Sequence, residues 1–264
     1  MSANDRAVLA GRKAIVTGAG KGIGQAIAHQ FAAEGAEVVL VARSAGDLER
    51  VAADIRAKGG TAHCAPTDMG DVDQVKAMVE KAASLMGGID IVVSNAAAYG
   101  EGPIAELSLE EWNEAQQVNV IGTLSLLKTA FPHLSANAVS NILVISSIRG
   151  LSGTPGTGAY GASKAALNHL TRTLAVEWGP AGVRVNAILP GPILTPQMEI
   201  AAKNNPTLGE AYENCAPLAG WSHPEDVAQP AVFLVSPAAQ RITGHLLVVD
   251  GGLVAINQDC LVLA

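Results

Sequence analysis

The sequence predicts an α/β fold, a doubly wound parallel sheet of about seven strands with helices on both faces. Short runs rich in β-branched residues alternate with longer helical patterns along nearly the whole chain. Most of these runs are continuously apolar, which strands buried on both faces of a parallel sheet require. No linker rich in Pro or Ser divides the chain, so we expect a single domain over residues 1–264.

Strands are expected at the short apolar runs, which are residues 14–17, 38–41, 61–65, 89–94, 141–146, 184–189 and 246–249. Apolar residues at helical spacing predict helices at residues 22–34, 47–58, 72–86, 109–130, 159–178 and 224–236. Four prolines are expected to interrupt regular structure in residues 191–222, and a loop of this length is usually a lid or a binding loop. Residues 253–264 form an apolar tail after the last expected strand.

The composition excludes several classes of protein. Apolar residues make up 49% of the chain and charged residues only 16%, which excludes a disordered chain, a coiled coil and a collagen-like chain. The net charge of −7 offers no basic surface for nucleic acid or for anionic lipid. The expected partner is therefore a small molecule, and a local basic pair could still hold one phosphate.

The same reasoning predicts a cytoplasmic protein. Residues 129–148 are uncharged but contain Pro132 and His133, so we expect no membrane span. Residues 1–13 lack the apolar segment of a secretory signal. The chain has three cysteines, Cys64, Cys215 and Cys260. Their odd number and wide spacing fit neither a disulfide framework nor a metal cluster, so no metal site is expected.

A glycine-rich turn at residues 17–24 directly follows the first expected strand and opens the first expected helix. Glycines permit a tight turn and a close approach of the backbone, and the free N–H groups of the helix start point toward an anion. The placement between strand and helix predicts that this turn binds the pyrophosphate of a dinucleotide. Without that placement, a glycine-rich string would indicate only an ordinary turn.

The end of the second expected strand indicates which dinucleotide is bound. An NAD site usually places a carboxylate about 20 residues after the glycine turn, where it binds the ribose 2′-hydroxyl. Here the strand ends in Arg43 and Ser44 and carries no carboxylate. The Arg43 guanidinium suits a phosphate and Lys21 adds a second cation, so NADP(H) is predicted over NAD(H). The alternative is that both are ordinary solvated charges.

Tyr160 and Lys164 are one helical turn apart, so their side chains share a face of the helix. A phenol has a pKa of about 10, and a neighbouring ammonium lowers that pKa toward the range useful for proton transfer. Ser147, at the end of the preceding expected strand, can hydrogen-bond the reacting oxygen. This set predicts acid/base chemistry at the carboxyl edge of the sheet.

From about Gly11 to Gly252, the chain resembles the classical short-chain dehydrogenase/reductase family, a single-domain Rossmann-type family. The motifs that carry the resemblance are the glycine turn, Asp68, residues 94–97, Asn119, Ser147, Tyr160 with Lys164, and residues 186–195.

The resemblance implies an oxidoreductase that interconverts a ketone and a secondary alcohol with NADP(H). Tyr160 would be the general acid in reduction and the base in oxidation, and Lys164 would hold the nicotinamide ribose and lower the Tyr160 pKa. Ser147 would orient the substrate oxygen, and Asn119 would anchor a water that relays protons through Lys164.

The resemblance also implies which residues bind the cofactor. Asp68 would contact the adenine, Asn95 would steady the sheet beside the cofactor, and Thr195 with the Ile193 backbone would hold the nicotinamide carboxamide. The expected cofactor residues are Gly18, Gly20, Lys21, Gly22, Ile23, Gly24, Arg43, Ser44, Asp68, Met69, Asn95, Ala96, Ala97, Tyr160, Lys164, Pro190, Gly191, Ile193 and Thr195.

Two positions near the expected substrate pocket depart from the family pattern. Ala97 replaces a glycine, so its methyl group would shift the backbone slightly near the cofactor. Arg149 stands where similar sequences often have a small residue, and it is either an anchor for an acidic substrate or a solvated or interface charge. The expected pocket residues are Tyr99, Ser147, Arg149, Leu151, Thr157 and Tyr160.

The helix expected at residues 159–178 carries a second stripe of mostly small side chains, including Ala162 and Ala166, about 100° from the stripe that faces the sheet. The family packs this helix against its symmetry mate, so a homotetramer or a homodimer is expected, with the tail free to cover a neighbouring subunit. Two other functions stay open, an NAD(H)-dependent alcohol dehydrogenase of the same family and a cofactor-binding regulatory protein without turnover.

Overall fold

Seven parallel strands form one sheet in the computed structural model, which describes residues 7–256. The strand order is β3-β2-β1-β4-β5-β6-β7, so the direction of winding reverses between β1 and β4. The strands are β1 (Lys13–Thr17), β2 (Glu37–Ala42), β3 (Thr61–Pro66), β4 (Ile91–Ser94), β5 (Ser140–Ile145), β6 (Val183–Pro190) and β7 (Leu246–Val249). The predicted fold class is confirmed.

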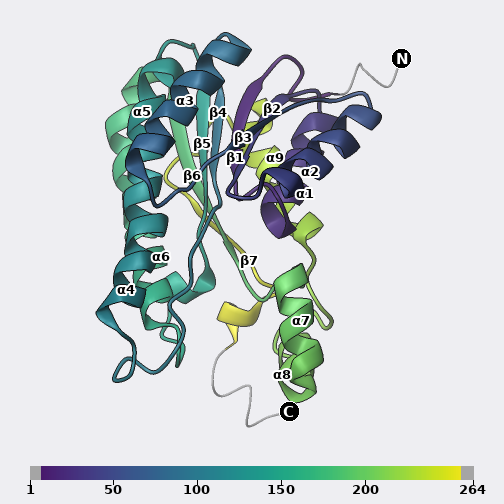
Figure 1. Cartoon of the computed structure of the whole chain (residues 1–264), viewed down its shortest axis with the longest axis vertical. Helices are drawn as coiled ribbons and strands as arrows, with labels where there is room; N and C mark the ends of the chain where they lie inside the picture. Colours follow the sequence, from purple (N-terminus) through teal and green to yellow (C-terminus); the bar gives the residue numbers. More distant parts are fainter. Residues whose placement is uncertain (1–6, 257–264) are drawn as a thin grey trace.

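Helices cover both faces of this sheet and give a molecule of three layers (Figure 1). Helices α3, α4, α5 and α6 lie on one side, and α1, α2 and α9 lie on the other (Figure 1). The helices are α1 (Gly22–Ala33), α2 (Ala45–Ala57), α3 (Val72–Met86), α4 (Leu109–Gln116), α5 (Thr123–Ser135), α6 (Gly158–Trp178), α7 (Pro196–Asn204), α8 (Pro206–Glu213) and α9 (Pro224–Val235).

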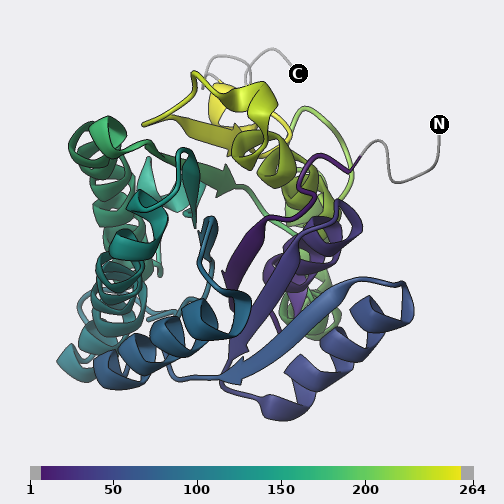
Figure 2. The ribbon, with the colours of Figure 1, turned by 90° about the horizontal axis from the view of Figure 1, so that it is seen from above.

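Successive residues of the central strand β1 enter different cores. Ala14 and Val16 pack in the core beneath α1, α2 and α9, whereas Ile15 packs in the core beneath α3, α5 and α6. All three side chains are completely buried. Because both faces of the sheet are covered, apolar residues are favoured on both, and this explains the mostly continuous apolar runs in the sequence. Seen from above, yellow α9 lies beside purple α1 and completes one covering layer (Figure 2).

The helix predicted at residues 109–130 is interrupted by an unexpected π-helical turn, η2 (Gln117–Gly122), between α4 and α5. This wide turn brings the chain against the segment after β3, since a Cβ on Gly122 would lie 2.1 Å from the Met69 carbonyl oxygen. The predicted end of this helix at residue 130 was also wrong. Helix α5 continues past Pro132 to Ser135, and Leu134 in its last turn is completely buried.

The prediction that prolines prevent regular structure in residues 191–222 is wrong. Helices α7 and α8 lie in this segment, and Pro196 and Pro206 each occupy the first position of a helix. Proline is well tolerated there, because the N–H group that it lacks would have no partner within the helix. The Thr195 hydroxyl caps α7 and the Asn205 side-chain amide oxygen caps α8.

The long helix α6 packs one stripe against the sheet, as predicted, and its second stripe is exposed in the single chain. Leu167 and Leu174 are buried against the sheet, whereas Ala162, Ala166 and His169 are exposed in the single chain. Within residues 7–256, no helix combines the length and the apolar character needed to cross a membrane. The predicted tail extends to Ala264, but only its first residues, up to Ile256, fall within the described part of the chain.

Candidate active site

The carboxyl ends of β1 and β4 are joined at the point where the winding reverses. The Thr17 hydroxyl accepts hydrogen bonds from the backbone N–H groups of Asn95 and Ala96, at 2.9 and 3.1 Å, and donates to the Val93 carbonyl oxygen at 3.2 Å. The Asn95 side chain donates back to the Thr17 carbonyl oxygen at 2.9 Å. These bonds fix the ends of β1 and β4 at the point beside which doubly wound folds bind ligands.

The glycine turn leaves no room for side chains beside this junction. A Cβ on Gly24 would lie 2.3 Å from the Gly18 carbonyl oxygen and 2.5 Å from the Asn95 amide nitrogen. Gly18 itself has a φ of 67°, in the left-handed region that favours glycine. Helix α1 then begins with no side-chain cap and no acidic residue in its first turn. Its free N–H groups and positive dipole end are therefore available to an anion.

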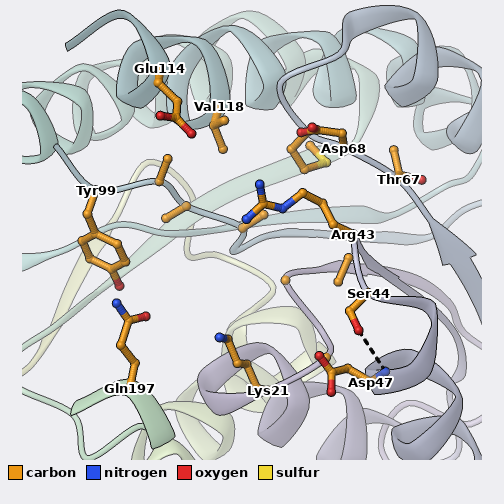
Figure 3. Close-up of a pocket in the computed structure, with 17 residues that line it drawn as sticks. Lys21, Arg43, Ser44, Asp47, Thr67, Asp68, Tyr99, Glu114, Val118 and Gln197 are labelled. Carbon is orange, nitrogen blue, oxygen red and sulfur yellow. Dashed lines mark hydrogen bonds between the residues drawn. The ribbon is translucent and has the colours of Figure 1, made fainter. Parts of the chain in front are cut away.

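A cavity of about 460 Å³ opens beside this turn (Figure 3). Arg43, from the end of β2, and Lys21, from the start of α1, both point into it (Figure 3). Neither cation has a carboxylate within 4.0 Å in the described part of the chain. The other predicted cofactor residues that line this cavity are Gly18, Gly20, Ser44, Asp68, Met69, Ala96 and Ala97.

A second cavity, of about 300 Å³, contains the predicted catalytic side chains Ser147, Tyr160 and Lys164. Ala97 and Tyr99 line both cavities, so the two are neighbours along the carboxyl edge of the sheet. The predicted cofactor residues found here are Ile23, Asn95, Ala97, Tyr160, Lys164, Pro190, Gly191, Ile193 and Thr195. Glycines 22 and 24 line neither cavity, and Gly24 serves the close packing of α1 on the turn.

Lys164 is buried beneath Tyr160 on α6. Its Nζ atom lies 5.3 Å from the centroid of the Tyr160 ring and donates a hydrogen bond to the Ile145 carbonyl oxygen at 2.9 Å. Loss of hydration lowers the pKa of Lys164 from 10.5 to about 8. A lysine with this pKa can both hold and release a proton near neutral pH.

The expectation that Lys164 lowers the pKa of Tyr160 is not met in this structure. Burial raises the Tyr160 pKa above its ordinary value, and Tyr99 adds to the increase. A hydrogen bond with Ser147 and the charge of Arg149 oppose it, but by less. The pKa of Tyr160 is raised because desolvation of the phenolate outweighs every nearby favourable interaction.

Asn119 lies in the π-helical turn and is completely buried. Its amide nitrogen donates to the Ala98 carbonyl oxygen and to the Ser163 hydroxyl, at 2.8 and 2.9 Å, and its oxygen accepts from the Ala98 N–H at 2.7 Å. The side chain therefore ties the chain after β4 to α6 at Ser163, which is three residues after Tyr160 and next to Lys164 in sequence. Its predicted part in a proton relay stays a prediction.

Arg149 is half-buried and lines the second cavity on the turn after Ser147. Its Nη2 atom donates to the Tyr212 hydroxyl of α8 at 2.9 Å. Leu151 and Thr157 are placed differently from our prediction. They line a separate hollow of about 320 Å³ on the outer side of the same turn, because Arg149 and Thr154 lie between that hollow and the catalytic side chains.

Sequence reasoning did not name several residues of the two cavities, among them Asp47, Thr67, Glu101, Glu114, Val118 and Thr154, and it included Gln197, Met198 and Tyr212 only as part of the expected binding loop at residues 191–222. Tyr212 had a local signal that could have placed it. Asn205 followed by Pro206 is a typical start of a helix, and that helix carries Tyr212 toward the cavity.

The residues present fit a nicotinamide dinucleotide. Two adjoining cavities meet at the start of α1, where any Cβ on Gly18 or Gly24 would clash. One cavity offers two cations suited to a phosphate, and the other offers the Tyr160 and Lys164 pair. Among residues 7–256, no three His, Cys, Asp or Glu side chains lie together in a way that could hold a metal ion.

Residues 18–254 match a family model described as enoyl-(acyl carrier protein) reductase. The chain is 36% identical to a 2,5-dichloro-2,5-cyclohexadiene-1,4-diol dehydrogenase of Sphingobium indicum, over 94% of this chain and 99% of the relative. A Beutenbergia cavernae structure with bound NADP, proposed as an NAD(P)-dependent gluconate 5-dehydrogenase, superposes with a TM-score of 0.89 at 37% identity, covering 95% of this chain and all of that one.

A 7α-hydroxysteroid dehydrogenase in complex with NADH and 7-oxo glycochenodeoxycholic acid also superposes with a TM-score of 0.89. It is 34% identical, and the match covers 96% of this chain and 98% of that one.

The fold and the site thus define a Rossmann-type oxidoreductase that uses a nicotinamide dinucleotide. The chain belongs to the short-chain dehydrogenase/reductase family.

Proposed function

We propose that this protein interconverts a secondary alcohol and a ketone by hydride transfer with NADP(H), using Tyr160 as the general acid/base. The observation that carries the proposal is the placement of Tyr160, Ser147 and Lys164 in one cavity next to the cavity of the glycine turn. The named relatives are dehydrogenases, and their names describe a ring diol and a hydroxysteroid. This supports a CH–OH group as the reacting group here.

When bound, the nicotinamide supplies or accepts the hydride. Tyr160 then donates its phenolic proton to the carbonyl oxygen during reduction and takes the hydroxyl proton back during oxidation. Its raised pKa keeps the phenol protonated at neutral pH, which suits the proton donor of the reduction. Ser147, which lines the same cavity as Tyr160, orients the substrate oxygen beside it.

Lys164 returns protons to Tyr160 after the phenol has donated one. A buried amine with a pKa of about 8 exchanges its proton readily near neutral pH. The Asn119 side chain, bonded to Ala98 and Ser163, holds the elements around this path in position.

The preference for NADP(H) over NAD(H) is supported by Arg43 and Lys21 at the first cavity. Both cations face the space beside the end of β2, where an NAD site would present a carboxylate to the ribose (Figure 3). A 2′-phosphate there would receive two charge-assisted hydrogen-bonding partners. Bound NADP in one structural neighbour is consistent with this proposal, and bound NADH in the other shows that the fold accepts either cofactor.

We also propose that the exposed face of α6 packs against a second copy of the chain, as the family resemblance implies. Ala162 and Ala166 on this face are small enough to let two helices approach closely. A molar mass of two or four chains in light scattering is the expected result, and a monomer at micromolar concentration would contradict it.

The experiment that tests the function is NADPH oxidation against a panel of ketones with wild type and Tyr160→Phe. The variant keeps the ring and loses the phenolic hydroxyl, so we expect its kcat/KM to fall about a hundredfold or more while NADPH binding persists. Equal rates would contradict the proposed chemistry. NADPH binding without turnover of any carbonyl by the wild type would instead favour a regulatory cofactor-binding protein.

A further inference from the structure

The second cavity holds a cation that the proposed hydride and proton transfers do not use. Arg149 lines this cavity together with Ser147 and Tyr160. Its guanidinium has five N–H donors, and in the described chain the only hydrogen bond from this group is the one to the Tyr212 hydroxyl. No carboxylate of residues 7–256 lies within 4.0 Å of it. Most of the guanidinium is therefore available to a ligand.

The position of Arg149 relative to the reacting groups is set by a rigid turn. The backbone N–H of Arg149 donates to the Ser147 hydroxyl at 3.2 Å, and the carbonyl oxygen of Gly150 accepts from the Asn168 side chain of α6 at 3.2 Å. The turn is pressed onto α6 so closely that a Cβ on Gly150 would lie 2.8 Å from the Lys164 carbonyl carbon. The backbone that carries Arg149 is thus packed directly against the catalytic helix.

The partner of Arg149 comes from the opposite wall. Tyr212 projects from α8, and its ring packs against Trp221, with ring centroids 6.1 Å apart. Because the Tyr212 oxygen accepts from Arg149, its own O–H is free to donate toward a ligand. A guanidinium and a phenolic O–H side by side form a binding site for a carboxylate.

We propose that the substrate carries a carboxylate, which Arg149 and the Tyr212 hydroxyl bind while its carbonyl or alcohol group faces Ser147 and Tyr160. The inference rests on the proposed ketone/alcohol chemistry of this same site. It assigns Arg149 and Tyr212 as specificity-determining residues and the substrate class as oxo acids and hydroxy acids.

The test compares two ketones that differ only in charge, 4-oxocyclohexanecarboxylate and its carboxamide. Steady-state kcat/KM for each is measured with NADPH for wild type, Arg149→Gln, Arg149→Lys, Tyr212→Phe and Arg241→Gln. Arg241 is an exposed arginine that precedes β7, so it lies on the side of the amino ends of the strands, away from the cavities at their carboxyl ends. It serves as the matched control.

We expect the wild type to prefer the acid by about ten- to a hundredfold, mainly through KM. In Arg149→Gln, the ratio of kcat/KM for the acid to kcat/KM for the amide should be close to one, and Arg149→Lys should restore part of the preference for the acid. Tyr212→Phe should lower the same ratio by about three- to tenfold relative to wild type. Arg241→Gln should match the wild type. Equal use of acid and amide by the wild type, or an acid preference that survives in Arg149→Gln, would overturn the proposal.

A binding measurement separates this inference from the proposed reaction. Calorimetric titration of cyclohexanecarboxylate and cyclohexanecarboxamide into the NADP(H)-bound protein needs no turnover. Tighter binding of the acid that is lost in Arg149→Gln would support the carboxylate site even if no ketone were reduced. Reduction of ketones with no difference between acid and amide would support the reaction and overturn the carboxylate site.

Discussion

The ring of Tyr99 stacks on the ring of Tyr160, with centroids 4.9 Å apart and planes inclined by 22°. Tyr99 follows β4 and Tyr160 belongs to α6, so the stack joins the chain beside the cofactor cavity to the catalytic helix. The contact limits the motion of the phenol that must deliver a proton. Tyr99 also helps to keep the pKa of Tyr160 high.

Removing the ring at position 99 is therefore expected to impair catalysis. In Tyr99→Leu we expect kcat/KM for ketone reduction to fall about tenfold, because the phenol loses a stacking partner and its position loosens. The pH at which alcohol oxidation reaches half its maximum should move down, since Tyr160 becomes better hydrated. Tyr99→Phe keeps the stack and should stay much closer to wild type. Identical kinetics and pH profiles for Tyr99→Leu and wild type would refute a positioning role for the stack.

The buried amine of Lys164 should make stability depend on pH. Its pKa is about 8 in the folded protein and 10.5 ordinarily, so between these values the unfolded chain binds more protons than the folded one. The free energy of unfolding of the wild type therefore increases as the pH rises through this window. Below about pH 8, Lys164 is charged in the folded protein, and the full cost of burying that charge lowers the stability. Lys164→Met has no such group.

The measurement is thermal unfolding of both proteins from pH 7 to 9.5 at constant ionic strength. The melting temperature of Lys164→Met minus that of the wild type should decrease as the pH rises. Tyr160, whose pKa lies higher, is common to both proteins and cancels in the difference. A difference that stays constant over the range would show that the Lys164 pKa is not lowered by burial.

The cation at the end of β2 should decide the choice of cofactor. In Arg43→Ala we expect the Kd for NADPH to rise about ten- to a hundredfold, because a charge-assisted contact to the 2′-phosphate is lost. The Kd for NADH should change little, since NADH lacks that phosphate. Fluorescence titration with both cofactors measures the ratio of the two Kd values. Lys81 is an exposed cation on α3, and Lys81→Ala is the control. An unchanged ratio in Arg43→Ala would leave Arg43 as an ordinary solvated charge.

Two glycines near the start of their helices should respond in opposite directions to alanine. In Gly24→Ala the new methyl group would meet the Gly18 carbonyl oxygen at 2.3 Å, so we expect a loss of about 1–3 kcal/mol and weaker cofactor binding. Gly46 is an exposed residue of α2, and nothing lies within 4 Å of a methyl group added there, so a gain of about 0.5–1 kcal/mol is expected in Gly46→Ala. Chemical denaturation measures the change in the free energy of unfolding of each variant. Equal changes in Gly24→Ala and Gly46→Ala would show that the glycine turn is not tightly packed.

Much of the fold was predictable because its signals are local. The seven apolar runs and the glycine turn each describe a few neighbouring residues, and all seven runs became strands of the sheet. The π-helical turn was not predictable, since it depends on how closely Gly122 approaches Met69 on another element. Helices α7 and α8 were missed for a different reason, because Pro196 and Pro206 were interpreted as breakers when they begin the helices.

The sequence by itself determined the fold class and the order of the motifs, since a period of apolar residues and the Tyr160 and Lys164 spacing are properties of single elements. Only the tertiary structure decided what those residues experience. Burial gives Lys164 a pKa of about 8 and raises that of Tyr160, and neither value follows from their spacing. The interpretation of Arg149 likewise depended on a contact with Tyr212, 63 positions away, because only folding brings α8 across the cavity from the turn after β5.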